Sequence, residues 1–202
     1  MKVLTYYSPC AGLPPQGGVL ERWVNSWAKA GYDPVVLNRS HAEQHPRYSE
    51  LLQVFKAYPT INPAEYELAC YLRWLALDAV GGGLMSDYDV MNVSLFPADI
   101  AKTDVLFYER RRVPCLVQTS EAGSKKLVEH LVHTKPPAGL HHWSDMVSLM
   151  KSDWLAVDHC TEIGDAGWDV SKTIHFAHGA CKKYRPSKSK HAIIDEVLKG
   201  RK

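Results

Sequence analysis

Apolar residues along the chain alternate between short β-prone runs and stretches with helical spacing. Residues 3–7 form an apolar run that stops at Ser8-Pro9, which predicts a buried strand leading into a loop. Apolar residues then recur at helical spacing over residues 19–30, and Gly31 follows as a stop. Residues 35–37 predict a second strand. A strand-helix-strand unit is usually parallel and binds ligands beyond the carboxyl ends of its strands.

The clearest single element is a helix expected over residues 64–80. Asn62 is a good N-cap, Pro63 suits the first helical position, and Glu65 follows three residues after the cap, as in a capping box. The residues that follow are apolar nearly all round, which is typical of a helix buried on most sides. The triple glycine at 81–83 ends this helix.

The rest of the chain carries weaker signals for regular structure. Residues 39–61 are polar and irregular around a candidate helix at 48–57. Further strands are expected at 104–108, 113–118 and 173–176, and further helices at about 124–133 and from a Ser144 cap to 150. The basic run 110–112 is expected in a solvated hairpin turn, and residues 187–202 as a basic peripheral tail.

Composition and charge exclude the unusual classes of protein. With 202 residues, 46% of them hydrophobic and 23% charged, the chain is long enough for one core. Its 24 Lys and Arg against 22 Asp and Glu require no nucleic-acid partner. The five scattered cysteines indicate neither a disulfide framework nor a zinc site, which favours a reducing compartment. We find no signal peptide and no apolar run of membrane-spanning length, so we expect a cytoplasmic protein.

An acidic pair carries the candidate chemistry. Asp87 and Asp89 stand two apart at the end of an expected strand, so their side chains point to the same side. Hard oxygen ligands suit Mg²⁺ or Mn²⁺, which keep open positions that substrate phosphates fill. An isolated D-x-D occurs by chance in many surface turns. Here it follows a buried helix and a triple glycine, an arrangement that aims the carboxylates from a rigid element into a cleft.

The segment Tyr71–Val90 resembles the DXD region of GT-A-fold glycosyltransferases. The nearest class is the glycosyltransferase sugar-binding region containing a DXD motif, in which an Arg-bearing helix, a Gly-Gly turn and a strand precede the D-x-D. Arg73 and Gly81-Gly82 take the first two places, while Gly83 and Ser86 stand where that family more often has larger apolar residues. The resemblance implies an α/β, GT-A-like (Rossmann-like) fold with a mixed, mainly parallel sheet flanked by helices.

The same resemblance implies roles for the acidic pair and for Arg73. It implies that Asp87 and Asp89 hold a divalent cation that bridges the diphosphate of a nucleotide-sugar, with Asp87 also near the ribose or the sugar. Independently of any family, a cation bound to the leaving diphosphate stabilises its growing negative charge. Arg73 lies on so apolar a helix that it needs an anionic partner. That partner is either the donor or, in a purely structural role, Asp78 or Asp89.

A second segment, residues 174–182, resembles the C-terminal H-F-x-G-x-x-K element of metal-dependent GT-A enzymes, with one extra residue before the glycine. The resemblance implies a histidine that completes the metal shell and a lysine that contacts diphosphate. We favour His175 as the ligand, because its neighbours resemble strand residues that face the opposite way, and we keep His178 as the alternative. Lys182 or Lys183 is the candidate phosphate contact.

Residues at the expected strand ends are candidates for nucleotide binding. Tyr6, Tyr7 and Ser8 end the first strand and Asn38 ends the second, where this fold places the base and the ribose. The two tyrosines have two possible roles: Tyr6 or Tyr7 stacks on a base, or one of them packs in the protein interior.

Acceptor-side candidates are less specific. The run His141-His142-Trp143 is a candidate acceptor wall, although helix capping by Ser144 explains part of this pattern more simply. An inverting enzyme needs a carboxylate base, and a retaining one does not. The candidate bases are Asp145, Asp153, Asp158 and Glu121.

We therefore expect residues 1–186 to form one GT-A-like catalytic domain, with a nucleotide-sugar-binding half at 1–90 and an acceptor and metal half at 91–186. The expected activity is transfer of a sugar from a UDP- or GDP-sugar to a glycan or other hydroxyl acceptor with Mn²⁺ or Mg²⁺. One alternative is a non-enzymatic nucleotide- or sugar-binding module. The other is a metal-dependent nucleotidyltransferase, although residues 10–18 lack the usual phosphate-loop spacing.

Overall fold

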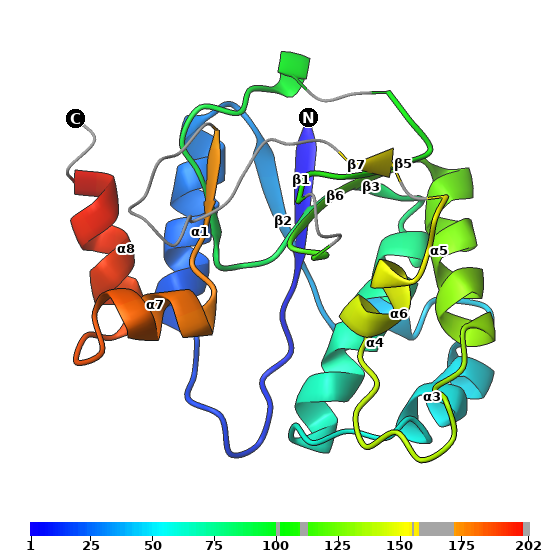
Figure 1. Ribbon diagram of the computed structural model, residues 1–202. Helices are drawn as coiled ribbons and strands as arrows, with labels where there is room; N and C mark the ends of the chain where they lie inside the picture. Colours follow the sequence, from blue (N-terminus) through cyan, green and yellow to red (C-terminus); the bar gives the residue numbers. More distant parts are fainter. Residues whose placement is uncertain (100–101, 110–112, 155, 158–171, 200–202) are drawn as a thin grey trace.

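One sheet organises the computed structural model, which describes residues 1–99, 102–109, 113–154, 156–157 and 172–199 (Figure 1). Within these residues six strands lie in the order β2-β1-β3-β6-β5-β7. They are β1 (Lys2–Tyr6), β2 (Asp33–Leu37), β3 (Gly83–Ser86), β5 (Val105–Phe107), β6 (Leu116–Thr119) and β7 (Ala156–Val157). β6 runs antiparallel to both of its neighbours, and the other adjacent pairs are parallel. The expectation of a mixed, mainly parallel sheet flanked by helices is therefore confirmed.

Helices cover both faces of this sheet (Figure 1). They are α1 (Gly17–Lys29), α2 (Arg39–Ala42), α3 (Tyr48–Lys56), α4 (Ala64–Ala79), α5 (Glu121–His133), α6 (Asp145–Met150), α7 (His178–Tyr184) and α8 (Lys190–Lys199). A short 3₁₀ helix, η1, spans Pro97–Asp99. Side chains alternate between the two faces of a strand, so Val3 joins the hydrophobic cluster under α1 and α8, whereas Leu4 joins the cluster under α3, α4 and α5.

A second, two-stranded sheet extends the structure beyond β3. β4 (Val90–Asn92) pairs antiparallel with β8 (Thr173–His175), so that Val90 lies opposite His175. The sequence pattern indicates β8, where apolar Ile174 and Phe176 alternate with His175, but not β4, whose residues show no such alternation. This pairing brings residues 173–175 close to the residues that follow β3.

The start of α4 differs from its expected form. Pro63, with extended backbone (φ −52°, ψ 128°), is the N-cap, so the expectation of Asn62 as the cap is wrong. The Asn62 side chain instead donates a hydrogen bond of 2.8 Å to Oε2 of Glu67. Glu67 is only 4% exposed, and a buried carboxylate requires such donors.

The described part of the C-terminal segment is not a peripheral tail, which corrects that expectation. Its helix α8 buries Ile193, Ile194 and Val197 in the cluster that α1 forms with β4 and β8. Arg22 of α1 donates two hydrogen bonds to Asp195, of 2.7 and 2.5 Å. Burial of one apolar face outweighs the basic composition of this segment. Two other expectations, on Asp158 and on the basic run 110–112, fall outside the described residues.

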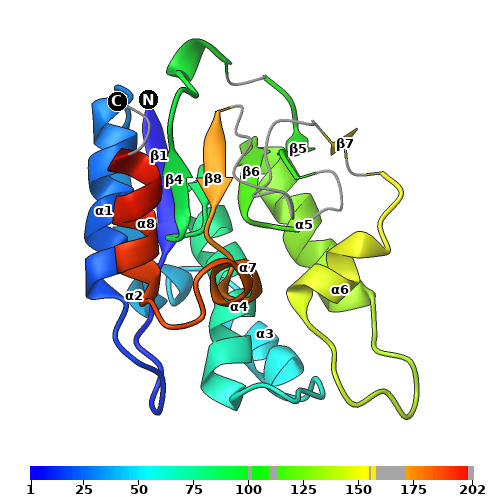
Figure 2. The ribbon, with the colours of Figure 1, turned by 60° about the vertical axis from the view of Figure 1, so that its left-hand side comes forward.

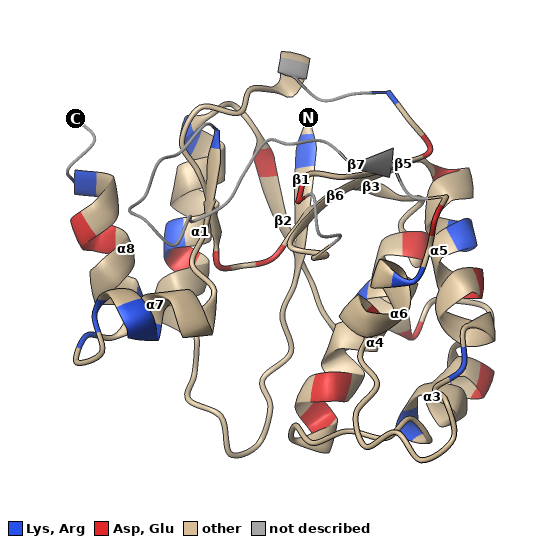
Figure 3. Cartoon of the chain, in the orientation of Figure 1, with Lys and Arg blue, Asp and Glu red and all other residues tan. Residues whose placement is uncertain are grey.

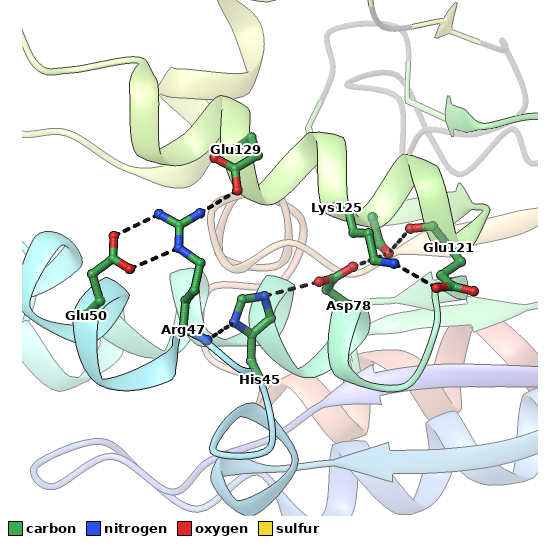
Figure 4. A network of polar contacts seen from close by, with 8 residues as sticks. His45, Arg47, Glu50, Asp78, Glu121, Lys125 and Glu129 are labelled. Atoms are coloured by element: carbon green, nitrogen blue, oxygen red, sulfur yellow. Dashed lines mark hydrogen bonds and ion pairs between the residues drawn. The ribbon is translucent and has the colours of Figure 1, made fainter.

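A polar network links α4 to α5 and to the loop before α3 (Figure 4). The Asp78 carboxylate of α4 accepts a 2.6 Å hydrogen bond from Oγ of Ser124 on α5. Its other oxygen lies 3.1 Å from Nε2 of His45. The His45 and Asp78 side chains are 5% and 8% exposed, so the contact is shielded from water. Arg47 extends the network on the surface to Glu50 and Glu129.

Replacing Asp78 by alanine is expected to destabilise the protein by about 3 kcal/mol. The substitution leaves buried polar groups of His45 and Ser124 without their carboxylate partner. The free energy of unfolding in urea measures the effect. Glu50→Ala, which removes an exposed ion pair of the same network, serves as the control and should leave the midpoint nearly unchanged. Equal effects of the two substitutions would contradict the role given to Asp78.

Candidate functional site

The carboxyl ends of three adjacent parallel strands meet at one edge of the sheet. Leu4 of β1 aligns with Val35 of β2 and with Met85 of β3, so the three strands end at nearly the same level. The residues that follow them include Tyr7, Asn38 and Asp87 respectively. This edge is where open α/β sheets bind their ligands.

Asp87, Asp89 and His175 come together at this edge. One ligand atom from each of the three lies within 4.8 Å of the others. His175 Nε2 lies 3.5 Å from Oδ1 of Asp89. The approach follows from the pairing of β4 with β8, which continues in a 2.8 Å hydrogen bond from the Phe176 backbone nitrogen to the Asp89 carbonyl oxygen. Two carboxylates and one imidazole are a donor set that fits a divalent cation.

The orientation of His175 agrees with the alternation expected of a strand. Ile174 and Phe176 are fully buried, whereas the His175 side chain is 21% exposed and faces the acidic pair. His178, the alternative ligand, is exposed at the first position of α7. Of the two histidines, His175 is the one that lies beside the acidic pair, and its role as a metal ligand stays a prediction.

Two tryptophans of α1 donate hydrogen bonds to the residues on either side of Asp87–Asp89. Trp23 Nε1 donates to Oγ of Ser86 at 3.1 Å, and Trp27 Nε1 donates to the carbonyl oxygen of Val90 at 3.0 Å. Both indoles are fully buried. The hydroxyl of Ser86 thus has a structural use at a position where the resembling family more often has an apolar side chain.

Arg73 of α4 joins Asp87 to Asp145. Its Nη1 lies 2.6 Å from Oδ1 of Asp87, while Nε lies 3.1 Å from Oδ2 of Asp145 and Nη2 also pairs with that oxygen. The structural partner expected from the sequence, Asp78 or Asp89, is therefore wrong. Asp78 lies five positions further along α4 and faces α5, and Asp89 faces the ammonium group of Lys190.

Asp145 is fully engaged by donors. It begins α6, is 3% exposed, and its Oδ1 accepts a 2.7 Å hydrogen bond from the Met146 nitrogen. Its Oδ2 accepts from Trp74 Nε1 at 2.9 Å in addition to Arg73. Ser144 caps the helix as expected, accepting from the Val147 nitrogen. The carboxylate therefore has little free accepting capacity.

Lys190 is the site residue that sequence reasoning missed. Its Nζ donates to Oδ2 of Asp89 at 2.6 Å. Lys182 and Lys183, the two candidates from the sequence, are both exposed on α7. The only available signal was the apolar spacing of residues 193, 194 and 197, which predicts a helix with one buried face but not the place where it packs.

The two aspartates differ in electrostatic state. Burial raises the pKa of Asp87 above its ordinary value, and the charge of Asp89 adds to the rise against the opposing charge of Arg73. Burial also acts to raise the pKa of Asp89, but His175 and Lys190 outweigh it and lower that pKa below its ordinary value. The negative charges of Asp87 and Asp89 thus repel each other, and a cation bound between the two carboxylates would reduce this repulsion.

Of the residues expected to bind the nucleotide, one is buried in the core and three lie at the accessible edge of the sheet. Tyr6 belongs to the hydrophobic core, and burial raises its pKa to about 12. Tyr7 is half-buried and stands edge-on to Tyr88, with ring centroids 5.5 Å apart. Ser8 is half-buried beside it, and Asn38 is exposed and caps α2 by accepting from the Ser40 nitrogen. Simple packing therefore accounts for Tyr6, and Tyr7 remains the candidate for stacking.

A second group of potential ligands lies beside Arg73. Ligand atoms of Glu67, Cys70 and Asp145 lie within 4.8 Å of one another. Glu67 Oε1 is buried without a hydrogen-bond partner, and burial raises the pKa of both Glu67 and Cys70. Sequence reasoning missed this group because Asp145, its third member, is distant in sequence from Glu67 and Cys70 and meets them only in the folded chain.

The remaining acceptor-side candidates are dispersed. Trp143 belongs to the core, because its side chain is fully buried and its backbone nitrogen donates to the Pro59 carbonyl oxygen. His141 and Asp153 are exposed, and His142 is half-buried. Glu121 forms an exposed pair with Lys125 on α5.

Together the fold and the site define a mixed α/β protein with a carboxylate and histidine cluster beyond the carboxyl ends of its parallel strands. Residues 16–162 match the family described as Domain of unknown function (DUF8765), and the chain belongs to this family. The matched region contains Arg73, Asp87 and Asp89, whereas His175 and Lys190 follow it. Neither the curated proteins nor the solved structures contain a match to this chain. None of the described helices has the length and apolar character needed to cross a membrane.

Proposed function

We propose that this protein is a divalent-cation-dependent glycosyltransferase of GT-A-like fold, which transfers a sugar from a UDP- or GDP-sugar to a hydroxyl acceptor such as a glycan. The observation that carries the proposal is the convergence of Asp87, Asp89 and His175 at the carboxyl edge of the sheet. The resemblance of residues 71–90 to the DXD region supports the same conclusion.

In this proposal Asp87, Asp89 and His175 hold Mn²⁺ or Mg²⁺. The bound cation acts as a Lewis acid that neutralises charge on the leaving nucleoside diphosphate. The two aspartates are only 29% and 14% exposed, so their charges are screened less than those of surface carboxylates. The protein thereby presents a concentrated negative charge to the cation.

Arg73 and Asp145 have supporting roles in the proposed reaction. Arg73 orients the Asp87 carboxylate and neutralises part of the charge around it. Asp145 holds the guanidinium from its other side. Because both Asp145 oxygens already accept hydrogen bonds, we assign it a positioning role in place of the catalytic-base role expected from the sequence.

The donor's nucleoside is proposed to lie over Tyr7, Ser8 and Asn38. These residues follow β1 and β2 at the edge shared with the acidic pair. The half-buried Tyr7 ring offers a surface for stacking a base, and the Ser8 and Asn38 side chains offer hydrogen bonds to ribose.

Incubation of the full chain with a panel of UDP- and GDP-sugars and hydroxyl acceptors tests the proposal. We expect release of nucleoside diphosphate from one class of donor, at least about tenfold faster with Mn²⁺ or Mg²⁺ than with EDTA. Cation-dependent binding of UDP or GDP without release from any donor would favour a binding module. Pyrophosphate release from nucleoside triphosphates would favour a nucleotidyltransferase. Either result would contradict the proposed activity.

A further inference from the structure

We propose that Lys190 is an internal counter-ion that competes with the divalent cation for Asp89, so that the cation and the nucleoside diphosphate bind cooperatively. This inference rests on the proposed function, because it takes Asp89 as a metal ligand. It adds a binding order to that site: the diphosphate draws Lys190 away and thereby raises the affinity for the cation.

The contact between Lys190 and Asp89 is close and shielded. Nζ lies 2.6 Å from Oδ2, and the two side chains are only 17% and 14% exposed. His175 Nε2 faces the other oxygen, Oδ1, at 3.5 Å. Both oxygens of Asp89 therefore face a nitrogen group of this chain, and a cation that binds Asp89 has to share or displace the ammonium group.

Tertiary packing, not local helix preference, places Lys190 here. Lys190 is the first residue of α8, and the first turn of that helix contains no acidic residue. A cation at a helix N-terminus is locally unfavourable, because the helix dipole is positive there. The backbone is held by the two hydrogen bonds between Arg22 and Asp195 and by buried Ile193 and Ile194, and α8 lies alongside α1 (Figure 2).

Lys190 can leave Asp89 without movement of α8. A lysine side chain is a compact charge on a flexible four-carbon stem, so a change of rotamer moves Nζ while the helix stays fixed. Among the described residues, α7 and the turn that leads to α8 also carry the basic side chains Lys182, Lys183, Arg185 and Lys188, so this side of the site is rich in positive charge (Figure 3). A diphosphate is the chemical group that would attract both the cation and the released ammonium.

The charge balance of the cluster links the two ligands. Asp87, Asp89 and Asp145 outnumber Arg73 and Lys190 by one charge. A divalent cation that binds while Lys190 stays on Asp89 therefore makes these five ion-paired groups positive in sum, so it binds against the ammonium charge. A diphosphate restores a negative balance. By thermodynamic linkage, each ligand then raises the affinity for the other by the same factor.

Titration of Mn²⁺ into the full chain, with and without UDP or GDP, tests the inference. Calorimetry or the electron paramagnetic resonance signal of free Mn²⁺ gives the dissociation constant. We expect Lys190→Gln to bind Mn²⁺ alone about tenfold more tightly than the wild type, and UDP or GDP to raise its affinity by a smaller factor. Lys199→Gln, at the exposed far end of the same helix, removes the same charge and should behave as the wild type.

The possible failures of the two proposals are distinguishable. The inference is overturned if Lys190→Gln and the wild type bind Mn²⁺ with equal affinity, both with and without nucleotide. If Asp89→Asn then abolishes binding, the proposed metal site stands. Absence of Mn²⁺ binding to the wild type and to the lysine variants, in all conditions, would overturn both. Lys190→Met, which retains the apolar stem, replaces Lys190→Gln if that variant melts at a lower temperature than the wild type.

Discussion

Asp89→Asn is expected to reduce the kcat/KM of metal-dependent donor cleavage by about 10²–10³-fold. The substitution keeps the size of the side chain but removes the negative charge that faces His175 and Lys190. It should also raise the dissociation constant for Mn²⁺ in the presence of nucleoside diphosphate, because a neutral amide is a poor ligand for a hard cation. Steady-state rates of nucleoside diphosphate release at saturating Mn²⁺, with the donor identified by the panel, measure the effect.

Asp33→Asn is the matched control for this prediction. Asp33 is exposed at the first position of β2, at the opposite end of the strand from the site, so the same chemical change there should leave the rate unaltered. Melting temperatures of both variants separate a lost ligand from a lost fold. Full metal-dependent turnover by Asp89→Asn would show that the acidic pair does not hold the cation.

Arg73→Met is expected to reduce the free energy of unfolding by about 3–5 kcal/mol. Methionine fills much of the same volume but leaves Asp145, whose side chain is 4% exposed, without its guanidinium. Asp87 loses the same partner, so its repulsion with Asp89 increases. Urea denaturation followed by circular dichroism measures the change.

Two further variants distinguish a buried charge from lost packing. Arg73→Lys keeps the charge but loses the planar fork that reaches both aspartates, so we expect an intermediate loss of stability. The double variant Arg73→Met/Asp145→Asn should recover part of the stability, because no unpaired charge then remains at Asp145. Additive effects of the two single substitutions would mean that the ion pair makes no coupled contribution.

The first half of the fold follows from local sequence patterns. The strands expected at 3–7 and 35–37 and the helices at 19–30 and 64–80 correspond to β1, β2, α1 and α4. The two helices show many residues of one period, so their buried faces are visible in the sequence, whereas the two strands are recognised as short apolar, β-prone runs. The α-helices and strands that were not predicted are α2, β4, β7, α7 and α8. Most of them are too short to show a period, and in α8 the basic composition conceals the apolar face.

The residues of the candidate site likewise divide into those that local sequence identifies and those that only tertiary packing brings there. Asp87, Asp89 and His175 could each be chosen from the residues around them, because the D-x-D follows a buried strand and His175 alternates with buried neighbours. The partner of Arg73 could not be chosen, since Asp145 lies 72 residues away and reaches it only through the packing of α6 against α5. The same limit concealed the contact of Lys190 with Asp89, which are 101 residues apart.

By itself, then, the sequence determined the local elements, the exposed or buried side of each, and the residue types that are able to hold a divalent cation. Only the tertiary structure decided which of these residues meet. The pairing of β8 with β4 places His175 at the acidic pair, and the docking of α8 on α1 places Lys190 there. The physical reason is that periodicity reports the buried face of an element, whereas the choice of partner depends on the fit of distant apolar surfaces that local pattern does not specify.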